Sequence, residues 1–440
     1  MKKFFETIRN IFSIEDLRVR ILNTLGFLII FRLGSFVALP GVNTTVLKDA
    51  EGGIAGFLNT FLGGAFSNAS IFGLGIMPYI SASIIIQLLT VAVPYFQRMQ
   101  KEGDTGRRRI NQITRVLTIL ITLAQGVGYV TSTIMSQKGA VMIDETLFIV
   151  SSIILLSAGT IFCMWLGEKI TDKGIGNGIS MLIMIGIISK FPAAIISEIS
   201  SKKIEGSISL IIEFLALFFV VMGTVMIVQA VRRIPVQYAK QMVGGKMYGG
   251  QRQYLPIKVN AAGVMPIIFA QALMFLPSMI ATIWSDQSDL AMTIGQTFSN
   301  PLSWQYNLVF AIMIILFTFF YTAITINPTQ MADDMKRNNG FIPGIKPGKP
   351  TADFIDNVLT RITLPGAMML AVIAVLPSIA ALLGVGTNLS YFYGGTSLLI
   401  MVGVILDTLQ QIESYLLMRR YDGLMKSGRI KGRSQTAVAS

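Results

Sequence analysis

The sequence predicts an all-α membrane protein with ten transmembrane helices, arranged as two five-helix halves. Of its 440 residues, 52% are hydrophobic and only 13% are charged, and the mean hydropathy is +0.64. A soluble domain carries about 25% charged residues, because its surface has to face water. Long apolar runs also recur along the chain, and each approaches the roughly 20 residues that a helix needs to cross the hydrocarbon layer. The chain is therefore expected to be solvated mainly by lipid.

Ten apolar runs meet this requirement. They lie at residues 20–40, 73–94, 112–135, 146–167, 176–197, 208–230, 261–284, 305–327, 362–384 and 393–414. The loops between them set the orientation, because Lys and Arg concentrate on the cytoplasmic side of membrane proteins. Arg107, Arg108 and Arg109 share one loop, whereas residues 285–304 contain no Lys or Arg. This contrast predicts that both termini are cytoplasmic.

Ten spans divide into five and five. An odd number of spans in each half inverts the second half relative to the first, which is the topology of an inverted repeat. The predicted parts are an N-terminal half at 20–197, an exterior loop at 198–207, a C-terminal half at 208–414 and a cytoplasmic tail at 415–440. Residues 1–19 mix charged and aromatic side chains, which favours an amphipathic helix on the membrane surface. A disordered tail is the alternative for this first segment.

The segment between the first two spans is apolar but too short to cross the membrane. Residues 56–71 read GFLNTFLGGAFSNASI and are interrupted by Gly63 and Gly64. Irregular backbone at membrane depth is tolerated only inside protein or beside a water-filled cavity. The segment is either a helix lying at the membrane interface or a short re-entrant helix in the mouth of a channel.

The residues that most enzymes require are missing. The chain has no histidine and a single cysteine, Cys163, and no phosphate-binding GxxxxGK[ST] loop. We therefore expect no cofactor, no metal and no catalytic residues, and the chain is predicted not to be an enzyme. Arg32, Glu213 and Asp407 lie within spans, but no acidic or histidine relay accompanies them. Arg32 and Asp407 are deep enough to need partners, and structural charges with satisfied partners are the expected role of all three.

Two cytoplasmic loops are longer than the others, at residues 231–260 and 328–361. They mix basic with aromatic side chains, which suits docking to an acidic protein or to ribosomal RNA. Solvated loops that follow the positive-inside rule are the alternative. The candidate docking residues are Arg232, Arg233, Lys240, Lys246, Lys336, Arg337, Lys346 and Lys349.

Several long strings in this chain resemble the SecY family of protein translocation channels. They are GGAFSNASIF at 63–72, GIMPYISASIIIQLL at 75–89, EGDTGRRRINQ at 102–112, MWLGEKITDKGIGNGIS at 164–180, RRIPVQYAK at 232–240, LPIKVNAAGVMP at 255–266, FIPGIKPGKPT at 341–351 and FYGGTSLLI at 392–400. They occur in order over nearly the whole chain, so the resemblance is far more specific than a short motif.

The resemblance implies an hourglass-shaped channel whose halves are hinged between spans five and six. Its waist is a ring of aliphatic side chains, carried over to Ile76, Ile80, Ile183, Ile268 and Ile400, with Ile84 and Ile179 as possible neighbours. Ile76, Ile80 and Ile84 are spaced by four residues and so share a helix face. An apolar constriction of this kind blocks ions by dewetting. Without the resemblance, an isoleucine stripe would indicate only core packing.

The resemblance also implies a plug and a lateral gate. The plug is the broken segment at about 56–68, with Gly56, Phe57, Phe61, Gly63, Gly64 and Phe66. The lateral gate, between spans two and three and spans seven and eight, lets signal sequences and membrane segments enter the lipid. Gln87 and Asn260 are polar residues near that seam and are expected to tune how hydrophobic an entering segment must be.

The function implied is that of the central subunit of a protein-conducting channel in the bacterial cytoplasmic membrane. It passes unfolded secretory polypeptides across the membrane and releases membrane-protein segments into the lipid. The implied partners are the small subunits SecE and SecG, the SecA motor ATPase, the ribosome, signal-bearing polypeptides and membrane lipid, but not DNA. The family's usual arginine is replaced by Lys346, which keeps the charge but loses the planar donor fork. Gly244, Gly245 and Lys246 stand where the family often has adjacent arginines.

Two other classes of function compete with the channel. A secondary transporter should place polar groups at a broken helix near the middle of the membrane. An intramembrane protease needs a Ser with a His, paired aspartates or a HExxH motif, and the absence of histidine excludes two of these routes. The lack of a buried acidic relay and the isoleucine waist implied by the resemblance favour the channel.

Overall fold

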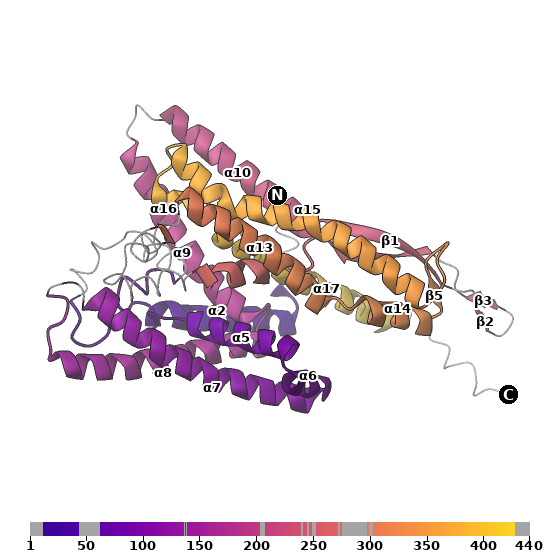
Figure 1. The fold of residues 1–440 in the computed structure, drawn as a ribbon, viewed down its shortest axis with the longest axis horizontal. Coiled ribbons are helices and arrows are strands. Elements are labelled where there is room, and N and C mark those ends of the chain that lie inside the picture. The colour runs from indigo at the N-terminus through magenta and orange to yellow at the C-terminus, as the bar shows by residue number, and fades with distance from the viewer. Residues whose placement is uncertain are drawn as a thin grey trace.

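The structure is a computed structural model of the full chain. It describes residues 12–43, 62–135, 137, 139–202, 207–238, 241–243, 246–248, 252–271, 273–274, 297–298 and 302–426. Within these ranges it describes only the backbone of residues 132, 207, 241–243, 246–248, 252 and 419–426. The chain is mostly helical, as predicted, and Figure 1 shows its long helices and a small group of strands.

Among the described residues, the first part of the chain forms six α-helices. They are α2 (Glu15–Gly34), α5 (Met77–Ala92), α6 (Pro94–Lys101), α7 (Asp104–Tyr129), α8 (Glu145–Lys173) and α9 (Gly178–Ser201), and α7 continues into a π-helical turn, η1 (Val130–Ile134). The Asn177 side chain caps the start of α9 by accepting the N–H groups of Ile179 and Ser180. Asp144 caps α8 in the same way at the N–H of Leu147. Such caps satisfy donors that a helix start leaves unpaired.

The second part of the chain forms another series of helices. They are α10 (Ser207–Gln229), α13 (Trp304–Thr325), α14 (Pro328–Arg337), α15 (Lys349–Leu382), α16 (Thr387–Ser390) and α17 (Gly395–Lys426). Residues 265–271 and 273–274 are also helical and lie in the span predicted at 261–284. Residues 261–264 form turns, and residues 272 and 275–284 of that span lie outside the described residues.

The two long loops predicted at 231–260 and 328–361 contain regular structure instead. Strand β1 (Val231–Tyr238) pairs with β4 (Arg252–Lys258) and with β5 (Gly340–Phe341), and β2 (Gln241–Val243) pairs with β3 (Lys246–Tyr248). All of these pairings are antiparallel. Helix α14 and the first turns of α15 occupy most of the second loop. Both long segments between spans are therefore ordered over much of their length.

The strands fold because one face of β1 and β4 is apolar. Ile234, Val236 and Ile257 are buried and pack with Met335 of α14 and Ile355 of α15. In β1, the buried Ile234 and Val236 alternate with the exposed Arg233 and Pro235, which is the two-residue period of a half-buried strand. The small sheet thus has its own core at one end of the molecule.

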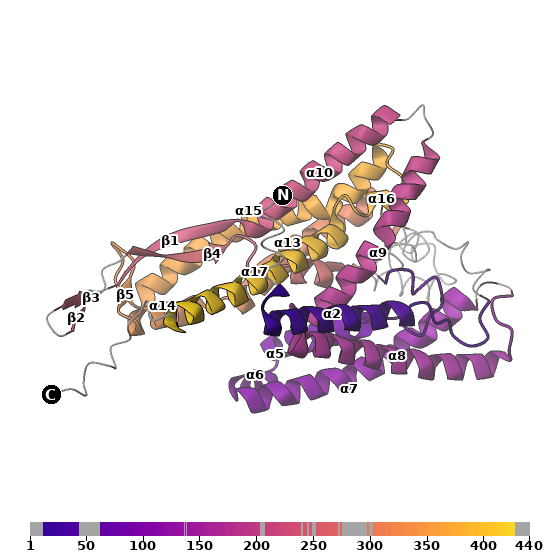
Figure 2. The ribbon, with the colours of Figure 1, turned by 180° about the vertical axis from the view of Figure 1, so that it is seen from behind.

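The long helices gather into two groups. The first helix group is α2, α5, α7 and α8, and the second is α10, α13, α15 and α17. Both views show the second group inclined to the first, with α9 at their junction (Figures 1 and 2). Helix α9 contacts α8 and α2 on one side and α17 and α16 on the other.

Among the described residues, seven helices are long and apolar enough to cross a membrane, and α5 with α6 makes an eighth if this pair, bent by 97°, counts as one span. Helix α2 is not one of the seven. It ends at Gly34, before the end of the first predicted span at residue 40, because the chain turns there to pair Ala38 with Ser70. It also begins inside the segment predicted at 1–19, whose first eleven residues lie outside the described ones.

Candidate functional site

The five predicted waist isoleucines come together in the structure. Two small adjoining cavities share Met77, Ile80 and Ile183. The first cavity is lined by Phe31, Leu62, Ile76, Met77, Ile80, Leu182 and Ile183. The second cavity is lined by Met77, Ile80, Ser81, Ile183, Ile268, Gln271, Thr396 and Ile400. Residues from α2, α5, α9, α17 and the helical residues 265–271 therefore meet at one place.

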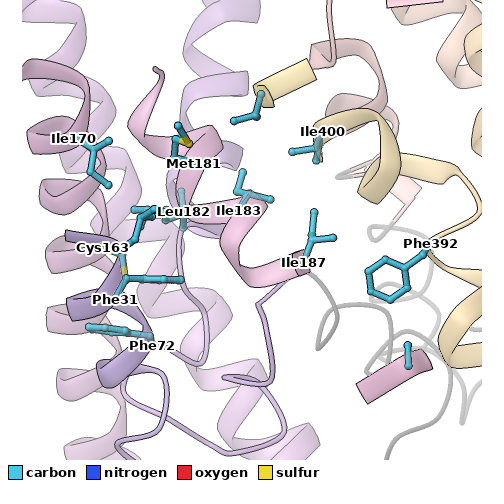
Figure 3. Packing of buried hydrophobic residues seen from close by; sticks show 14 of the residues in the cluster. Phe31, Phe72, Cys163, Ile170, Met181, Leu182, Ile183, Ile187, Phe392 and Ile400 are labelled. Atoms are coloured by element: carbon cyan, nitrogen blue, oxygen red, sulfur yellow. The ribbon is translucent and has the colours of Figure 1, made fainter. Parts of the chain in front are cut away.

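The surroundings of these isoleucines are tightly packed. Ile76, Ile183 and Ile400 are 4%, 9% and 2% exposed and belong to one apolar cluster. Ile80 and Ile268 are half-buried and pack against the same cluster. Figure 3 shows Ile183 on α9 and Ile400 of α17 pointing toward each other. Five branched aliphatic side chains thus meet at the junction of both helix groups.

The space left at this constriction is very small. The first cavity measures about 10 Å³ and the second about 30 Å³. A water molecule requires roughly 10–15 Å³ and two to four polar partners. The first cavity, with its entirely apolar side chains, offers no such partners. The second cavity is larger and has the polar side chains of Ser81, Gln271 and Thr396 on its wall.

The two possible neighbours of the ring line neither cavity. Ile84 is buried on α5. Ile179 packs toward α8, where a Cβ added to Gly167 would lie 3.0 Å from its Cγ1, and it also packs against the apolar cluster of Ile76, Ile183 and Ile400.

The predicted plug segment is only partly described. Gly56, Phe57 and Phe61 lie outside the described residues, and residues 62–69 form turns rather than a helix. Leu62 lines the first cavity beside Ile76 and Ile80, so this segment lies directly against the constriction. The described residues 62–71 of this segment therefore lie inside the protein, which favours the channel-mouth interpretation over a helix on the membrane surface.

Gly63 is held by the one arginine that the sequence places deep in a span. Arg32 Nη1 donates a hydrogen bond of 3.0 Å to the carbonyl oxygen of Gly63. Gly63 has a φ of +62°, and a Cβ there would lie 2.9 Å from Gly186 Cα, so only glycine fits. The guanidinium of Arg32 also lies 5.3 Å from the ring centre of Phe36. Arg32 thus has the partners that its depth requires.

The rest of the described segment is anchored on η1 and the end of α7. The Tyr129 hydroxyl donates a 2.6 Å hydrogen bond to the carbonyl of Phe66, and their ring centres are 4.6 Å apart. Gly64 has a φ of +93°, and a Cβ there would lie 3.0 Å from Lys190 Cε. The segment therefore contacts α2, α9 and the end of α7.

Of the two predicted gate residues, one lies within a helix and the other in a turn. Gln87 is half-buried on α5, and its Nε2 is 3.5 Å from Ser83 Oγ. Asn260 is 6% exposed in the turn that leads from β4 to the helical residues 265–271. Asp407 is exposed on α17, within the span-length stretch Gly395–Met418.

The predicted docking residues gather around the small sheet. Arg232 and Arg233 are exposed on β1, Lys336 and Arg337 on the last turn of α14, and Lys346 and Lys349 before and at the start of α15. Lys240 lies outside the described residues, and of Lys246 only the backbone in β3 is described. The described basic side chains are solvent-accessible and held on ordered structure.

Sequence reasoning missed several residues at the constriction. Phe31, Leu62, Met77 and Leu182 line the first cavity, and Ser81, Gln271 and Thr396 add polar groups to the second. Met77 and Ser81 could have been found, because they directly follow Ile76 and Ile80 on α5. Phe31 and Leu62 had no such signal, since only the three-dimensional fold brings them to the site.

Comparison with known proteins identifies the family. The sequence profile of SecY matches residues 70–409. The chain belongs to the SecY family. It is 41% identical to the protein translocase subunit SecY of Mycobacterium bovis, over 97% of this chain and all of that one. It is 40% identical to the subunit of Chlamydia muridarum, over 97% of this chain and 99% of that one. Family membership confirms the expectation of a channel subunit rather than an enzyme.

Solved structures show the same fold. One described as a protein-conducting channel matches with a TM-score of 0.66 and 18% identity, over 90% of this chain and 92% of that one. Another is of Sec61 in a canine ribosome–channel complex, with a TM-score of 0.61, 17% identity and the same coverage of 90% and 92%. The SecY fold agrees with the predicted class of helical membrane protein.

Proposed function

We propose that this chain forms the pore through which unfolded polypeptides cross the bacterial cytoplasmic membrane. The observation that carries the proposal is the meeting of Ile76, Ile80, Ile183, Ile268 and Ile400 around two cavities with little free volume. Its SecY relatives are named as translocase subunits. The ring is the seal of the idle channel and the contact surface for the moving chain.

Branched aliphatic side chains suit both tasks. These five side chains themselves offer no polar partner to water or an ion in the closed state, which favours dewetting of the constriction. They also offer a passing polypeptide no strong hydrogen bond, so no residue of the substrate is held. When the two helix groups part, the ring widens around the substrate while the isoleucines still contact it.

The segment at about 56–68 acts as the plug in this proposal. Leu62 lies against the ring, and the Arg32–Gly63 hydrogen bond fixes the described end of the segment. A solved SecY structure that matches with a TM-score of 0.64 and 20% identity is titled for a plug domain that stabilises the closed state and maintains a membrane seal. Displacement of the plug breaks one hydrogen bond at Gly63 and one at Phe66.

In this proposal the two helix groups belong to the halves predicted at 20–197 and 208–414, which are joined beyond the end of α9 at Ser201. Their separation opens the lateral gate between α5 and α7 on one side and the helical residues 265–271 and α13 on the other. Gln87 and Asn260 place amide groups near that seam, where they favour opening only for strongly hydrophobic segments. Lipid accepts the released segments.

The partners follow from the basic surface and from the relatives. Both termini and the small sheet face the cytoplasm, where the exposed Arg232, Arg233, Lys336, Arg337, Lys346 and Lys349 dock the SecA motor or the ribosome. Structural relatives include channels in ribosome complexes, among them the yeast Ssh1 complex, which matches with a TM-score of 0.58 and 13% identity. SecE and SecG complete the channel.

Reconstitution tests the proposed function. Liposomes that contain this chain with its small subunits, supplied with the motor ATPase, ATP and a signal-bearing precursor, should make the precursor resistant to added protease. Liposomes without this chain give the background. A protected fraction no higher than that background would contradict the proposal.

A further inference from the structure

A third cavity lies within the second helix group, beside the constriction. It measures about 30 Å³ and lies between α13, α15, the start of α17 and the end of the helical residues 265–271. We call it the polar cavity, because its wall differs from the apolar wall of the first cavity. It includes the polar side chains of Gln271, Tyr306, Asn307, Ser378, Thr396 and Ser397.

Two hydroxyl groups of this wall have no hydrogen-bond partner among the described residues. They are Thr396 Oγ1 and Ser397 Oγ, and both residues are only 1% exposed. Buried hydroxyls elsewhere in the group are satisfied, since Thr318 and Thr322 on α13 donate to carbonyls of their own helix. Nearly all buried polar groups in proteins bind either protein atoms or ordered water. The hydroxyls of Thr396 and Ser397 therefore require a partner from the cavity.

The backbone beside the cavity adds further hydrogen-bonding groups. Helix α17 begins at Gly395, and the first N–H groups of a helix have no partner within it. On the facing helix, Pro377 of α15 has no N–H to donate to the carbonyl of Ile373. A Cβ at Gly394 would overlap that carbonyl, so the start of α17 lies directly against the break in α15. Backbone donors and an acceptor thus accompany the two hydroxyls.

Size and charge determine which ligand fits the polar cavity. The described residues on its wall include no charged side chain, so an ion there would have no counter-charge. A water molecule requires roughly 10–15 Å³ and two to four polar partners. The cavity, at about 30 Å³, has the volume and the polar groups for one or two water molecules.

The polar cavity adjoins the constriction through two residues. Gln271 and Thr396 line both the polar cavity and the second cavity. Gln271 comes three residues after Ile268 in the same helical stretch, and Ile400 comes four residues after Thr396 on α17. Residues at these spacings lie on the same face of a helix, one turn apart. Both ring residues of the second helix group are therefore one turn away from the wall of the polar cavity.

We propose that the polar cavity binds one or two ordered water molecules, and that these waters hold Ile268 and Ile400 in position in the ring. The waters accept hydrogen bonds from N–H groups at the start of α17 and bind the hydroxyls of Thr396 and Ser397. They thereby link α17 to the wall that α13 and α15 form. Water binding stands on the cavity itself, whereas its effect on the ring rests on the proposed channel function.

Radiolytic footprinting tests the water site, because X-rays convert a bound water into a hydroxyl radical that oxidises the nearest side chain. Phe310 lines the polar cavity and is 4% exposed, whereas Phe148 is 0% exposed and lines none of the three cavities. In liposomes that contain the channel with its small subunits, mass spectrometry should show Phe310 oxidised at least about fivefold faster than Phe148. Equal oxidation of the two phenylalanines would overturn the water site.

A variant that adds no volume tests what the waters do. Thr396→Val with Ser397→Ala removes both hydroxyls, so Phe310 oxidation should fall toward that of Phe148 and ion leak through idle channels should rise by about threefold. Thr318→Val is the matched control, because it removes a buried hydroxyl of α13 that bonds to its own helix outside the cavity. The control should change neither reading.

Ser397→Ala alone covers the case in which the double variant fails to fold, and it should lower Phe310 oxidation by about twofold. Wild-type oxidation of Phe310 in both variants would contradict water binding at these hydroxyls. Reduced oxidation with an unchanged ion leak would contradict the effect on the ring. Wild-type protein that translocates no precursor would instead contradict the proposed channel, and the oxidation of Phe310 would still report on the water site.

Discussion

Arg32 shows how a single residue couples a membrane span to the proposed plug. Its guanidinium is satisfied by the Gly63 carbonyl and the Phe36 ring. A hydrogen bond to a charged group contributes about 1.5–3 kcal/mol, and a buried charge without a partner costs more. The arginine therefore stabilises the segment at Gly63 only while the segment lies against α2, which makes the contact sensitive to plug movement.

Replacing this arginine should loosen the plug. Arg32→Met keeps most of the side-chain volume but removes the donor to Gly63, so ion leak through idle channels in liposomes should rise by roughly tenfold, as expected for the loss of about 1.5 kcal/mol. Arg18→Met, on the exposed face of the same helix, is the matched control and should leave the leak unchanged. Equal leak in the two variants would contradict the role of Arg32.

The waist residues make a second residue-level prediction. Ile80→Ser with Ile183→Ser places hydroxyls at two side chains that line both cavities, so water should enter and ion conductance of idle channels should rise by at least about tenfold. Ile84→Ser with Ile179→Ser changes the same two helices outside the cavities and is the control. If the control pair leaks as much as the Ile80 and Ile183 pair, the ring is assigned to the wrong residues.

The sequence alone could not show which isoleucines form the ring. Isoleucine is common in any membrane span, so periodicity places Ile76, Ile80 and Ile84 on one face without saying which of them meets another helix. The family resemblance supplied that choice. The structure brings Ile76 and Ile80 together with residues more than a hundred positions away and leaves Ile84 outside.

Among the elements, the small sheet matters most for the proposed docking of partners, because the predicted docking residues lie around it. Lys346 is exposed in the turn between β5 and α15, and its backbone carbonyl accepts a 2.9 Å hydrogen bond from the Thr351 hydroxyl. The turn is thus held rigidly while the charged side chain is free to reach a partner. A fixed backbone lowers the cost of ordering this lysine on binding.

Charge at this turn should matter more than side-chain shape. Lys346→Arg keeps the charge and is expected to support motor-driven translocation close to wild type, whereas Lys346→Glu should reduce it by about tenfold, because a like-charge contact with an acidic partner opposes docking. ATP-dependent precursor protection in liposomes measures both. Equal translocation by the two variants would show that this turn is not a motor contact.

Helices were easier to predict from the sequence than strands. The span predicted at 146–167 lies inside α8, and that at 305–327 matches α13 within a few residues. Strands β1 and β4 were missed because Pro235 and Pro256 argue against regular strands. The structure accommodates Pro235 because only Gln237 and Tyr238 of β1 pair with β5.

For the whole molecule, the junction of the two helix groups is the central feature. Ser81 on α5 and Gln271 from the second part of the chain both line the second cavity. Any widening of the constriction must carry these two positions apart if the groups move as units. Contacts of this kind, like that between Gly176 and Gln411, join residues far apart in sequence and have no signature in a single sequence.

Linking the two groups should therefore block transport. In a Cys163→Ala background, Ser81→Cys with Gln271→Cys joined by a short bifunctional reagent should reduce translocation by about tenfold or more, since the channel cannot widen. Met77→Cys with Leu182→Cys, both within the first part of the chain and lining the first cavity, is the matched pair and should block less. A stronger block by the matched pair would contradict separation of the groups.

The most direct test of the conduit places a photo-crosslinking amino acid at Ile183. This residue lines both cavities and is only 9% exposed, so in the closed channel it contacts its own protein. In membranes that hold a stalled secretory precursor, we predict a crosslink from position 183 to the mature region of the precursor. Crosslinks confined to the exposed basic surface, with none at position 183, would show that the polypeptide docks without entering the waist and would contradict the channel.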